Sequence, residues 1–526
     1  MAVTILSILA LPLLVWVLYL ELKRDLMMFQ QNSYRSERYN KWLSESKDTT
    51  SWQRIVALIV FFNTLRPLGS GLTTYILVII LGLWIAIPLN KRKYKKPLVW
   101  TARAQRIYAV CAVLVLGIIL ASSLIFNSFM AVTAAAVGCY CGSHIIILAA
   151  NIILKPVEKH INRRYYNDAR SRLQSMPDLK IIGITGSYGK TSTKHYLHRI
   201  LSEQFDTLMT PGSYNTTLGV IRTIREYLKP YNEVFIVEMG AKSRGDVKEI
   251  CDLVKPAMGI ITAVGPQHLE SFKTIENVQK AKFELADALP ADGLAVVNND
   301  FKMIANREVS NTGCARYSAT DINADYKAKN INYSPEGTTF TVEGPNDWKI
   351  DIATRLMGEC NVSDLLAAII IAHKLGVSDA KIASAIASIE PVEHRLSVKR
   401  TPGGITILDD AFNSNPVGSR MALEVLGSMK SGKRIVITPG MIELGEQQYE
   451  LNHALGETIA KHADLAIIVG QYNRQAITEG IRTSEEFPED KLHTVDTFAQ
   501  AQQLLSTLAA KGDIILYEND LPDTFK

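Results

Sequence analysis

The sequence predicts a multi-pass α-helical membrane region followed by two α/β domains with mostly parallel sheets. Three observations predict this arrangement. Apolar runs are concentrated before residue 155, basic residues cluster between those runs, and from residue 180 short β-rich runs alternate with helical stretches. We expect a transmembrane region at 1–155, a basic connector at 156–177, a central domain at 178–395 and a C-terminal domain at 396–526.

Each of five apolar runs in the first region is a candidate membrane span, because a helix of about 20 apolar residues can cross a bilayer. The second run is short and contains Asn63, so a re-entrant or interfacial segment is an alternative. No small-residue cleavage site follows the first run, which favours a retained span over a cleaved signal peptide. The runs lie at 3–20, 55–65, 72–89, 107–126 and 129–154.

Positive charge is concentrated in the same region. Residues 1–176 contain 21 Lys and Arg against 7 Asp and Glu, whereas the whole chain has a net charge of only +5. Basic clusters at 23–47, 91–106 and 155–172 flank the apolar runs, and about five spans with the N-terminus outside would place all three in the cytoplasm. Nucleic-acid binding is an alternative for basic segments. Beside apolar runs we interpret them as orientation signals and contacts to anionic membrane lipids.

The six cysteines indicate neither a disulfide framework nor a metal site. Cys139 and Cys141 form a C-x-C inside an apolar run, with no second pair or histidine cluster nearby. We therefore expect a reduced, cytosolic environment for the soluble part.

The soluble part begins with alternating strands and helices, which predicts a mostly parallel sheet covered on both faces. The sequence changes character near 305–355, where INYSPEGTTFTVEG alternates in polarity and predicts antiparallel strands. A second α/β unit follows, with a boundary near 391–399. The expected strands are 180–185, 233–238, 258–263, 294–298, 405–408, 434–438, 465–469 and 513–517, and the expected helices of the first unit are 192–204, 219–228, 243–253 and 278–288.

Residues 186–191, GSYGKT, form a glycine-rich turn between a predicted strand and a predicted helix. Backbone N–H groups of such a turn can surround phosphate oxygens, Lys190 can reach the terminal phosphates, and the Thr191 hydroxyl can bind Mg²⁺. The turn departs from the longer G-x-x-x-x-G-K-[ST] motif because Ile184 occupies its first glycine position. A fortuitous turn is the alternative, but the strand–loop–helix context favours a nucleotide site.

Three further residues belong to the candidate site. Glu238 ends a predicted strand, where an open α/β sheet binds its ligand, and a carboxylate there can complete the coordination of Mg²⁺. His268 follows another strand end, and Lys282 lies on a predicted helix. Taken singly, His268 could be a helix cap and Lys282 a solvated charge.

Seven motifs follow one another along the soluble part: GSYGKTS, NTTLGV, VEMGAKSRGDV, VGPQHLESF, AKFEL, DDAFNSNP and GMIELGE. In this order they resemble the Mur ligase family, ATP-dependent enzymes that form amide bonds in bacterial cell-wall synthesis. The branch that adds D-alanyl-D-alanine is most similar, through EMGAKSRGD, GPQHLE and ELGE. The resemblance covers residue 180 to the C-terminus and implies a P-loop-type central domain and a Rossmann-like C-terminal domain.

The resemblance also implies site residues and cofactors: ATP, two Mg²⁺ ions and a CO₂-derived carbamate on Lys282. Lys190, Glu238, His268 and Lys282 would be catalytic, with Thr191 and Glu238 holding one ion and His268 and carbamylated Lys282 the other. The implied ATP-binding residues are Gly186, Ser187, Tyr188, Gly189, Lys190, Thr191, Ser192, Asn361, Asp364, Arg395 and Asp410. The implied substrate-binding residues are Asn215, Thr216, Thr217, Asn413 and Asn415.

The sequence departs from the family pattern at several places. Asp364 stands where a second Asn is usual. An Asp can accept a hydrogen bond from the adenine amino group but cannot donate one to the ring nitrogen, which weakens the expectation of adenine selectivity. Pro439 and the ending LYENDLPDTFK depart in the domain that should select the amine. Apolar runs replace the domain that grips the UDP-sugar in soluble members.

We therefore expect a multi-pass protein of the bacterial inner (cytoplasmic) membrane, with its catalytic domains in the cytoplasm. It would form an acyl phosphate on a UDP-linked or lipid-linked muramoyl peptide, with the lipid-linked form favoured, and join it to D-alanyl-D-alanine or an amino acid. We expect membrane lipids as partners and no nucleic acid. The alternatives are a membrane-anchored poly-amino-acid synthetase of the capsule type and an ATPase subunit of an export system. Against the export ATPase, the expected spans carry no acidic residue and no Walker-B-like run is evident.

Overall fold

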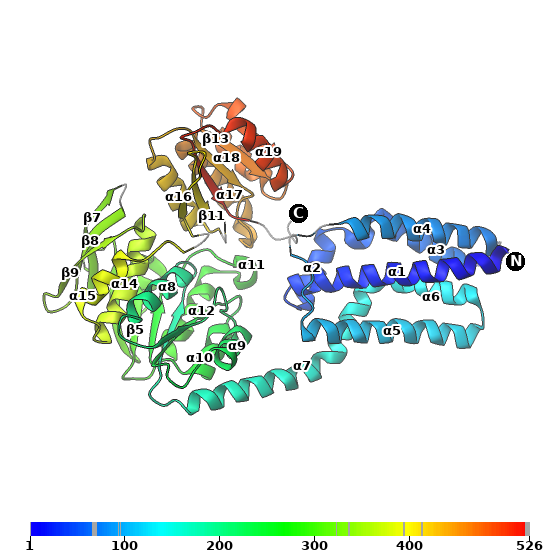
Figure 1. Cartoon of the computed structure of the whole chain (residues 1–526), viewed down its shortest axis with the longest axis horizontal. Coiled ribbons are helices and arrows are strands. Elements are labelled where there is room, and N and C mark those ends of the chain that lie inside the picture. The colour runs from blue at the N-terminus through cyan, green and yellow to red at the C-terminus, as the bar shows by residue number, and fades with distance from the viewer. Residues whose placement is uncertain are drawn as a thin grey trace. The chain divides into compact units, whose positions relative to one another are not determined.

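The computed structural model describes residues 2–520, apart from 66–70, 93, 95, 322, 335–336, 393–394 and 412–413. The chain divides into two compact units, of which the first ends at Arg163 and the second comprises Arg164–Asp520 (Figure 1). The predicted order, a helical region followed by two α/β domains, is confirmed.

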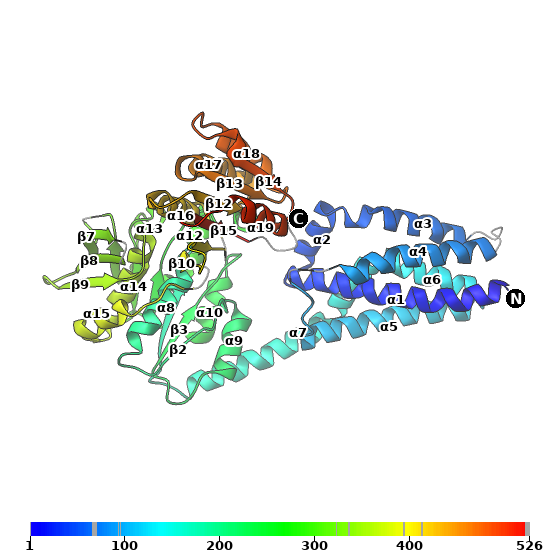
Figure 2. The same ribbon diagram turned by 45° about the horizontal axis from the view of Figure 1, so that its top comes forward.

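The first unit is a bundle of helices (Figures 1 and 2). Helix α1 packs against α4, α5 and α6, and α3 packs against α4 and α6. Large apolar side chains of α5, such as Leu116, Leu120 and Leu124, remain exposed on the bundle, as expected for a surface that faces lipid. The elements are α1 (Ala2–Gln31), α2 (Ser36–Glu45), η1 (Asp48–Thr50), α3 (Trp52–Thr64), α4 (Gly71–Lys91), α5 (Ala102–Phe126), α6 (Phe129–Cys141) and α7 (Ser143–Gln174).

Three helices of the described chain are long and apolar enough to cross a membrane: α1 from Ile5 to Gln31, α4 and α5. Helices α6 and α7 meet at an angle of 77°, and if they form one broken span the number rises to four. Helix α3 has 13 residues, which corresponds to about 20 Å of helix and is shorter than a bilayer core. The sequence predicted about five spans, and α3 is the short second run that had the interfacial alternative.

The expectation that the spans lack acidic residues is wrong for α1. The apolar run stops at Leu20, but the helix continues to Gln31 and carries Glu21 and Asp25, which are both buried. Absence of acidic residues in the spans therefore cannot be used to exclude a transport function.

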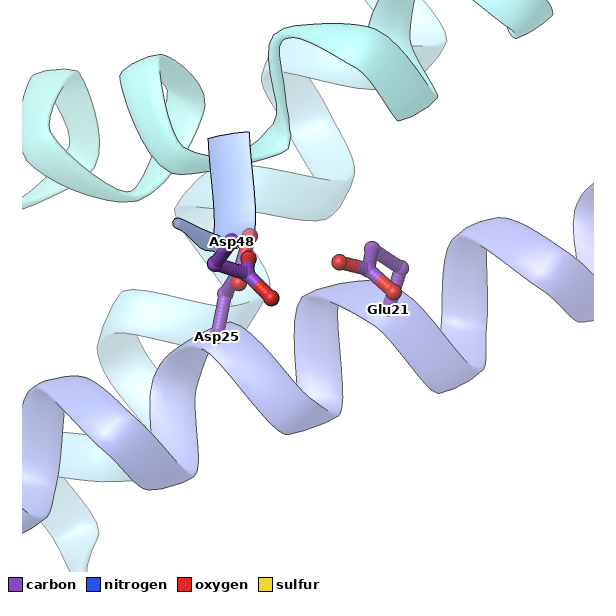
Figure 3. Close-up of side chains that lie close together, drawn as sticks. All are labelled: Glu21, Asp25 and Asp48. Carbon is purple, nitrogen blue, oxygen red and sulfur yellow. The ribbon is translucent and has the colours of Figure 1, made fainter. Parts of the chain in front are cut away.

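Arg54 of α3 explains why these carboxylates are tolerated inside the bundle. Figure 3 shows Glu21, Asp25 and Asp48 close together. Arg54 Nη2 lies 2.7 Å from Glu21 Oε1, 3.4 Å from Asp48 Oδ2 and 3.9 Å from Asp25 Oδ2. Its Nη1 donates to the last two carbonyl oxygens of α6, at 3.1 and 3.0 Å. Arg24 of α1 also pairs with Glu21, at 2.8 Å, and with Asp48. Two guanidinium groups thus compensate the carboxylates, and Arg54 in addition caps the negative end of a helix; without these partners both features would be costly.

The central domain contains a nine-stranded sheet in the order β2-β3-β1-β4-β5-β6-β7-β8-β9. Strands β1 to β7 are parallel, and β8 and β9 are antiparallel additions, as predicted for residues 305–355. The strands are β1 (Lys180–Thr185), β2 (Thr207–Met209), β3 (Val234–Glu238), β4 (Met258–Ile261), β5 (Leu294–Asn298), β6 (Gly313–Ser318), β7 (Tyr326–Ser334), β8 (Gly337–Glu343) and β9 (Lys349–Thr354).

Helices cover both faces of this sheet, each over its own apolar core. Helices α8, α14 and α15 contribute to one core, and α9, α10 and α12 to the other. Ligand sites in such sheets lie at the carboxyl ends of the strands. In this domain that edge is formed by the carboxyl ends of β1, β3 and β4. The helices are α8 (Lys190–Leu201), α9 (Thr217–Glu226), α10 (Asp246–Val254), α11 (Leu269–Phe272), α12 (Ile275–Asp287), α13 (Lys302–Ala305), α14 (Glu359–Lys374) and α15 (Asp379–Ala387).

The C-terminal domain has a six-stranded sheet in the order β10-β11-β15-β12-β13-β14, parallel except for β10. Strand β15 is inserted between β11 and β12, so the last connection, from β14, runs back across the sheet. The elements are β10 (Ser397–Arg400), β11 (Thr406–Asp410), α16 (Pro416–Ser428), β12 (Arg434–Thr438), η2 (Gly445–Gln447), α17 (Gln448–His462), β13 (Leu465–Val469), α18 (Arg474–Arg482), η3 (Glu489–Lys491), β14 (Leu492–Val495), α19 (Phe498–Leu508) and β15 (Ile514–Glu518).

Candidate active site

The glycine-rich loop joins the carboxyl end of β1 to the start of α8. Gly186 has φ +155°, and a Cβ there would lie 2.0 Å from Thr262 Oγ1, so only glycine fits the turn. Lys190 Nζ donates to the carbonyl oxygens of Gly186 at 2.7 Å and Ser187 at 3.2 Å. The ammonium therefore lies over the loop, beside the N-terminal N–H groups of α8, where a phosphate chain would bind.

Three side chains of the described residues contact the carboxylate of Glu238, at the end of β3. Thr191 Oγ1 lies 3.3 and 3.2 Å from its two carboxylate oxygens, Asn215 Nδ2 donates to Oε1 at 3.1 Å, and Lys194 Nζ lies 3.0 Å from Oε2. Burial alone would raise the pKa of Glu238, but the ammonium groups of Lys194 and Lys190 bring it below its ordinary value. The site thus holds an ionised carboxylate beside a hydroxyl, which are hard oxygen ligands suited to Mg²⁺.

Lys194 is a site residue that the sequence analysis missed. Its side chain is fully buried, and besides Glu238 its Nζ donates to the carbonyl oxygen of Gly212. It therefore links the carboxylate to the segment that leads to Asn215. The available signal was its position four residues after Lys190, which places both lysines on the same face of the helix.

His268 and Lys282 lie on the other side of the same site. His268 precedes α11 with φ +51°, and its Nδ1 contacts Glu443 Oε2 of the C-terminal domain. Lys282 on α12 is 1% exposed, and among the described residues no hydrogen bond or ion pair reaches its ammonium. Burial, followed by the charge of Lys190, brings the pKa of Lys282 well below its ordinary value. Burial also lowers the pKa of His268, and Lys282 contributes to that shift, so these side chains share one electrostatic environment.

A pocket of about 280 Å³ lies beside the glycine-rich loop, between α14 and the start of the C-terminal domain. Asp364 of α14 faces the loop so closely that a Cβ on Gly189 would lie 2.2 Å from its Oδ1. Burial raises the pKa of Asp364 to about 8. The predicted nucleotide residues that line this pocket are Tyr188, Gly189, Ser192, Asn361, Asp364, Arg395 and Asp410.

Several predicted ligand residues also have structural partners. Asn361 accepts from the Tyr196 hydroxyl at 2.6 Å and donates to the Met357 carbonyl at 2.7 Å, so half of its hydrogen-bonding capacity is used by the protein. Thr216 caps α9, with its Oγ1 accepting from Gly219 N at 3.3 Å.

Asn415 caps α16 in the same way, accepting from Gly418 N at 2.8 Å. Thr217 is the first residue of α9. Asn413 lies outside the described residues. Among the predicted substrate-binding residues, Thr216 and Asn415 therefore act as helix caps, and Asn215 contacts the carboxylate of Glu238.

Glu518 is a second residue that the sequence did not single out. It is paired in register with Asp410 across β15 and β11, so both side chains point to the same face. Glu518 is fully buried and accepts from the Ser414 hydroxyl. Burial raises the pKa of both carboxyls, so near neutral pH the pair is less negative than two ordinary carboxylates.

Comparison with known proteins identifies the same two domains. Residues 184–372 match the Mur ligase middle domain, and residues 394–517 match the glutamate ligase domain of Mur ligases. The UDP-N-acetylmuramoyl-tripeptide–D-alanyl-D-alanine ligase of Escherichia coli is 30% identical over 337 residues, covering 63% of this chain and 74% of that protein. The Bacillus subtilis enzyme of the same name is 28% identical over 354 residues, covering 66% and 75%.

A solved structure has the same fold. MurF from Acinetobacter baumannii superposes with a TM-score of 0.61 at 27% identity, covering 68% of this chain and 77% of that one. The family models do not reach the residues before 184, which include the first unit. From residue 184 onward the chain thus matches both Mur ligase domains and the fold of that solved structure, and the chain belongs to the Mur ligase family.

Proposed function

We propose that this protein is an ATP-dependent peptide ligase that joins a muramoyl peptide to D-alanyl-D-alanine or an amino acid. The observation that carries the proposal is the arrangement of Lys190, Thr191 and Glu238 around the phosphate loop, in a chain of the Mur ligase family. The substrate class follows the names of the relatives in Escherichia coli and Bacillus subtilis.

The reaction has two steps. A substrate carboxylate oxygen attacks the γ-phosphorus of ATP, which gives an acyl phosphate and ADP. The amine then attacks the acyl carbon, phosphate leaves with the bonding electron pair, and the nitrogen loses a proton. Thr191 and Glu238 would hold Mg²⁺, which would supply positive charge to the phosphate oxygens. Lys190 and the loop N–H groups stabilise the charge that develops on those oxygens.

The second ion is assigned to His268 and to a carbamate on Lys282. Burial lowers the pKa of the Lys282 amine, which favours its neutral, nucleophilic form. Attack of that amine on CO₂ would form an N–C bond and release one proton. The carbamate offers Mg²⁺ an anionic oxygen ligand, whereas the ammonium form of Lys282 would be repelled by the ion. The donor set of the site fits this role, since it combines an imidazole with a buried and unpaired amine.

The first unit favours an acceptor presented at a bilayer. Its three or four helices of spanning length lie before residue 184, outside both family models. We therefore propose that the protein is anchored in the bacterial inner membrane, with its catalytic unit in the cytoplasm, and acts on a lipid-linked muramoyl peptide.

The test is ATP-dependent phosphate release by the full chain in lipid nanodiscs, with D-alanyl-D-alanine or single amino acids as amine. We expect release that requires Mg²⁺, an amine and a lipid-linked acceptor. Phosphate release that occurs with the UDP-linked acceptor but not with the lipid-linked acceptor would contradict the lipid-linked assignment. Release without any amine would instead favour the export ATPase. Product growth from glutamate without a muramoyl acceptor would favour the poly-amino-acid synthetase.

We predict that nucleotide affinity depends on the protonation of Asp364. Because burial raises its pKa to about 8, the carboxyl is neutral below that pH and can both donate to and accept from adenine, as an amide does. Above pH 8 it ionises and loses its donor. The KM for ATP should therefore change little from pH 6.5 to 7.5 and rise above pH 8. Asp364→Asn should rise less, because it keeps only the part that comes from Lys190, whose pKa burial lowers to about 8. A wild-type profile with no rise up to pH 9.5 would contradict this.

A further inference from the structure

Glu443 of the C-terminal domain reaches into the candidate metal site of the central domain. Its Oε2 contacts His268 Nδ1, and its Oε1 lies 3.2 Å from Lys242 Nζ. The backbone N–H of Glu270 donates to the Glu443 carbonyl oxygen at 3.3 Å. Glu443 thus meets both the loop after β3 and the loop before α11, although 175 residues separate it from His268.

The contact determines which nitrogen of His268 can bind a metal ion. With Nδ1 held by a carboxylate, Nε2 is the ring nitrogen that remains available. A carboxylate on the far nitrogen fixes the tautomer and the ring orientation of a metal-ligating histidine and raises its basicity. The Glu443 carboxylate contacts Nδ1 of His268 in this way and leaves Nε2 for the metal ion.

A simple surface ion pair does not account for the arrangement. The Lys242–Glu443 pair is partly exposed, at 38% and 24%, and such pairs contribute little to stability. Both His268 and Glu443 also adopt left-handed backbone conformations, with φ of +51° and +62°, which non-glycine residues rarely adopt. The surrounding structure therefore holds each residue in an unfavourable conformation at the point where they meet.

We propose that Glu443 is a positioning residue that orients His268 toward Mg²⁺, so that the second ion site is complete only while the C-terminal domain lies against the central domain. The inference rests on the proposed role of His268 as a metal ligand. The Glu443–His268 contact would link the docking of the C-terminal domain to the affinity of the second ion. The same docking brings the amine to the acyl phosphate.

The test uses Mn²⁺ in place of Mg²⁺ and counts bound ions by electron paramagnetic resonance, in the full chain with a non-hydrolysable ATP analogue. We expect two ions in the wild type and one in His268→Ala. In Glu443→Gln the weaker ion should bind about 10- to 100-fold less tightly, the range found when a partner of a metal-ligating histidine is removed. Lys242→Met should show a smaller change, because it leaves the carboxylate–imidazole contact in place.

Glu446→Gln is the matched control, since it makes the same chemical change three residues away at an exposed position. If Glu443→Gln binds both ions like Glu446→Gln while His268→Ala loses one, the positioning role of Glu443 is overturned. If His268→Ala itself binds two ions as tightly as the wild type, the proposed His268 ligand role fails instead. Should the Gln variant not fold, Glu443→Asp keeps the charge with a shorter reach and carries the same comparison.

Discussion

Replacing Lys282 with alanine is expected to abolish measurable ligase turnover, and added formate or acetate should restore part of it. Removing one group that stabilises charge in a transition state costs about 10²–10³ in kcat. Loss of an anionic metal ligand should cost at least as much. The substitution also opens space beside the ions, into which a small carboxylate can bring the missing oxygen ligand.

The structure makes this prediction specific to Lys282. The side chain is buried on α12, whereas Lys280 on the same helix is exposed. Lys280→Ala is therefore the control, and we expect its turnover to be unchanged with or without formate. Phosphate release at fixed ATP and Mg²⁺, measured across formate concentrations, checks both variants.

Folding defects must be separated from loss of the ligand. Burying an amine without a partner is unfavourable, so Lys282→Ala should unfold at the same temperature as the wild type or higher. Full activity in Lys282→Ala would remove the carbamate role. A stable, inactive variant that no small carboxylate rescues would show that Lys282 acts in another way.

Several strands of the soluble part could be predicted because each has its own local signal. β1, β3, β4 and β5 are buried apolar runs that end in a polar residue or are followed by one, and they begin and end within two residues of the predicted positions. β2 has three half-buried residues and β10 has four, three of them exposed, so neither forms a recognisable buried run. They exist because longer neighbouring strands pair with them.

The same distinction applies to the candidate site. Lys190, Thr191 and Glu238 could be predicted because a glycine turn and a strand end each carry a local pattern. The contacts of Glu443 with His268 and of Tyr196 with Asn361 join residues 175 and 165 positions apart. Only the packing of whole elements creates such contacts, and no spacing in the sequence indicates them.

The extent of α1 shows the limit of reading composition alone. The run of apolar residues ends at Leu20, yet the helix continues because Arg24 on the same helix and Arg54, 33 residues after Glu21, compensate the charges that follow. A buried charge is acceptable only when a partner is present. Arg24 lies in the sequence window around Glu21, but Arg54 comes from another helix, so that window could show only one of the two partners.

Replacing Lys194 with methionine is the second change for which we expect a large effect. The Lys194–Glu238 pair is 0% and 1% exposed, and removing one partner of a buried pair typically costs about 3–5 kcal/mol because the other charge is left uncompensated. The variant also loses the hydrogen bond to Gly212, which ties the segment before Asn215 to the site. We therefore expect both a lower unfolding temperature and a higher KM for the muramoyl acceptor.

The effect of Mg²⁺ and pH separates this explanation from a simple packing defect. In the wild type the ammonium groups keep the pKa of Glu238 below its ordinary value, so the pair stabilises the fold above that ordinary pKa, about 4.3, and the contribution disappears as the pH falls through the lower folded-state value. The gap in unfolding temperature between the wild type and Lys194→Met should therefore be largest at neutral pH and smaller in acid. Mg²⁺ with ADP should stabilise the variant more than the wild type, because the ion compensates the carboxylate that Lys194 otherwise pairs. Lys248→Met, at an exposed position on α10, should show neither behaviour. A gap that is independent of both pH and Mg²⁺ would mean that Lys194 contributes packing rather than charge to the metal site.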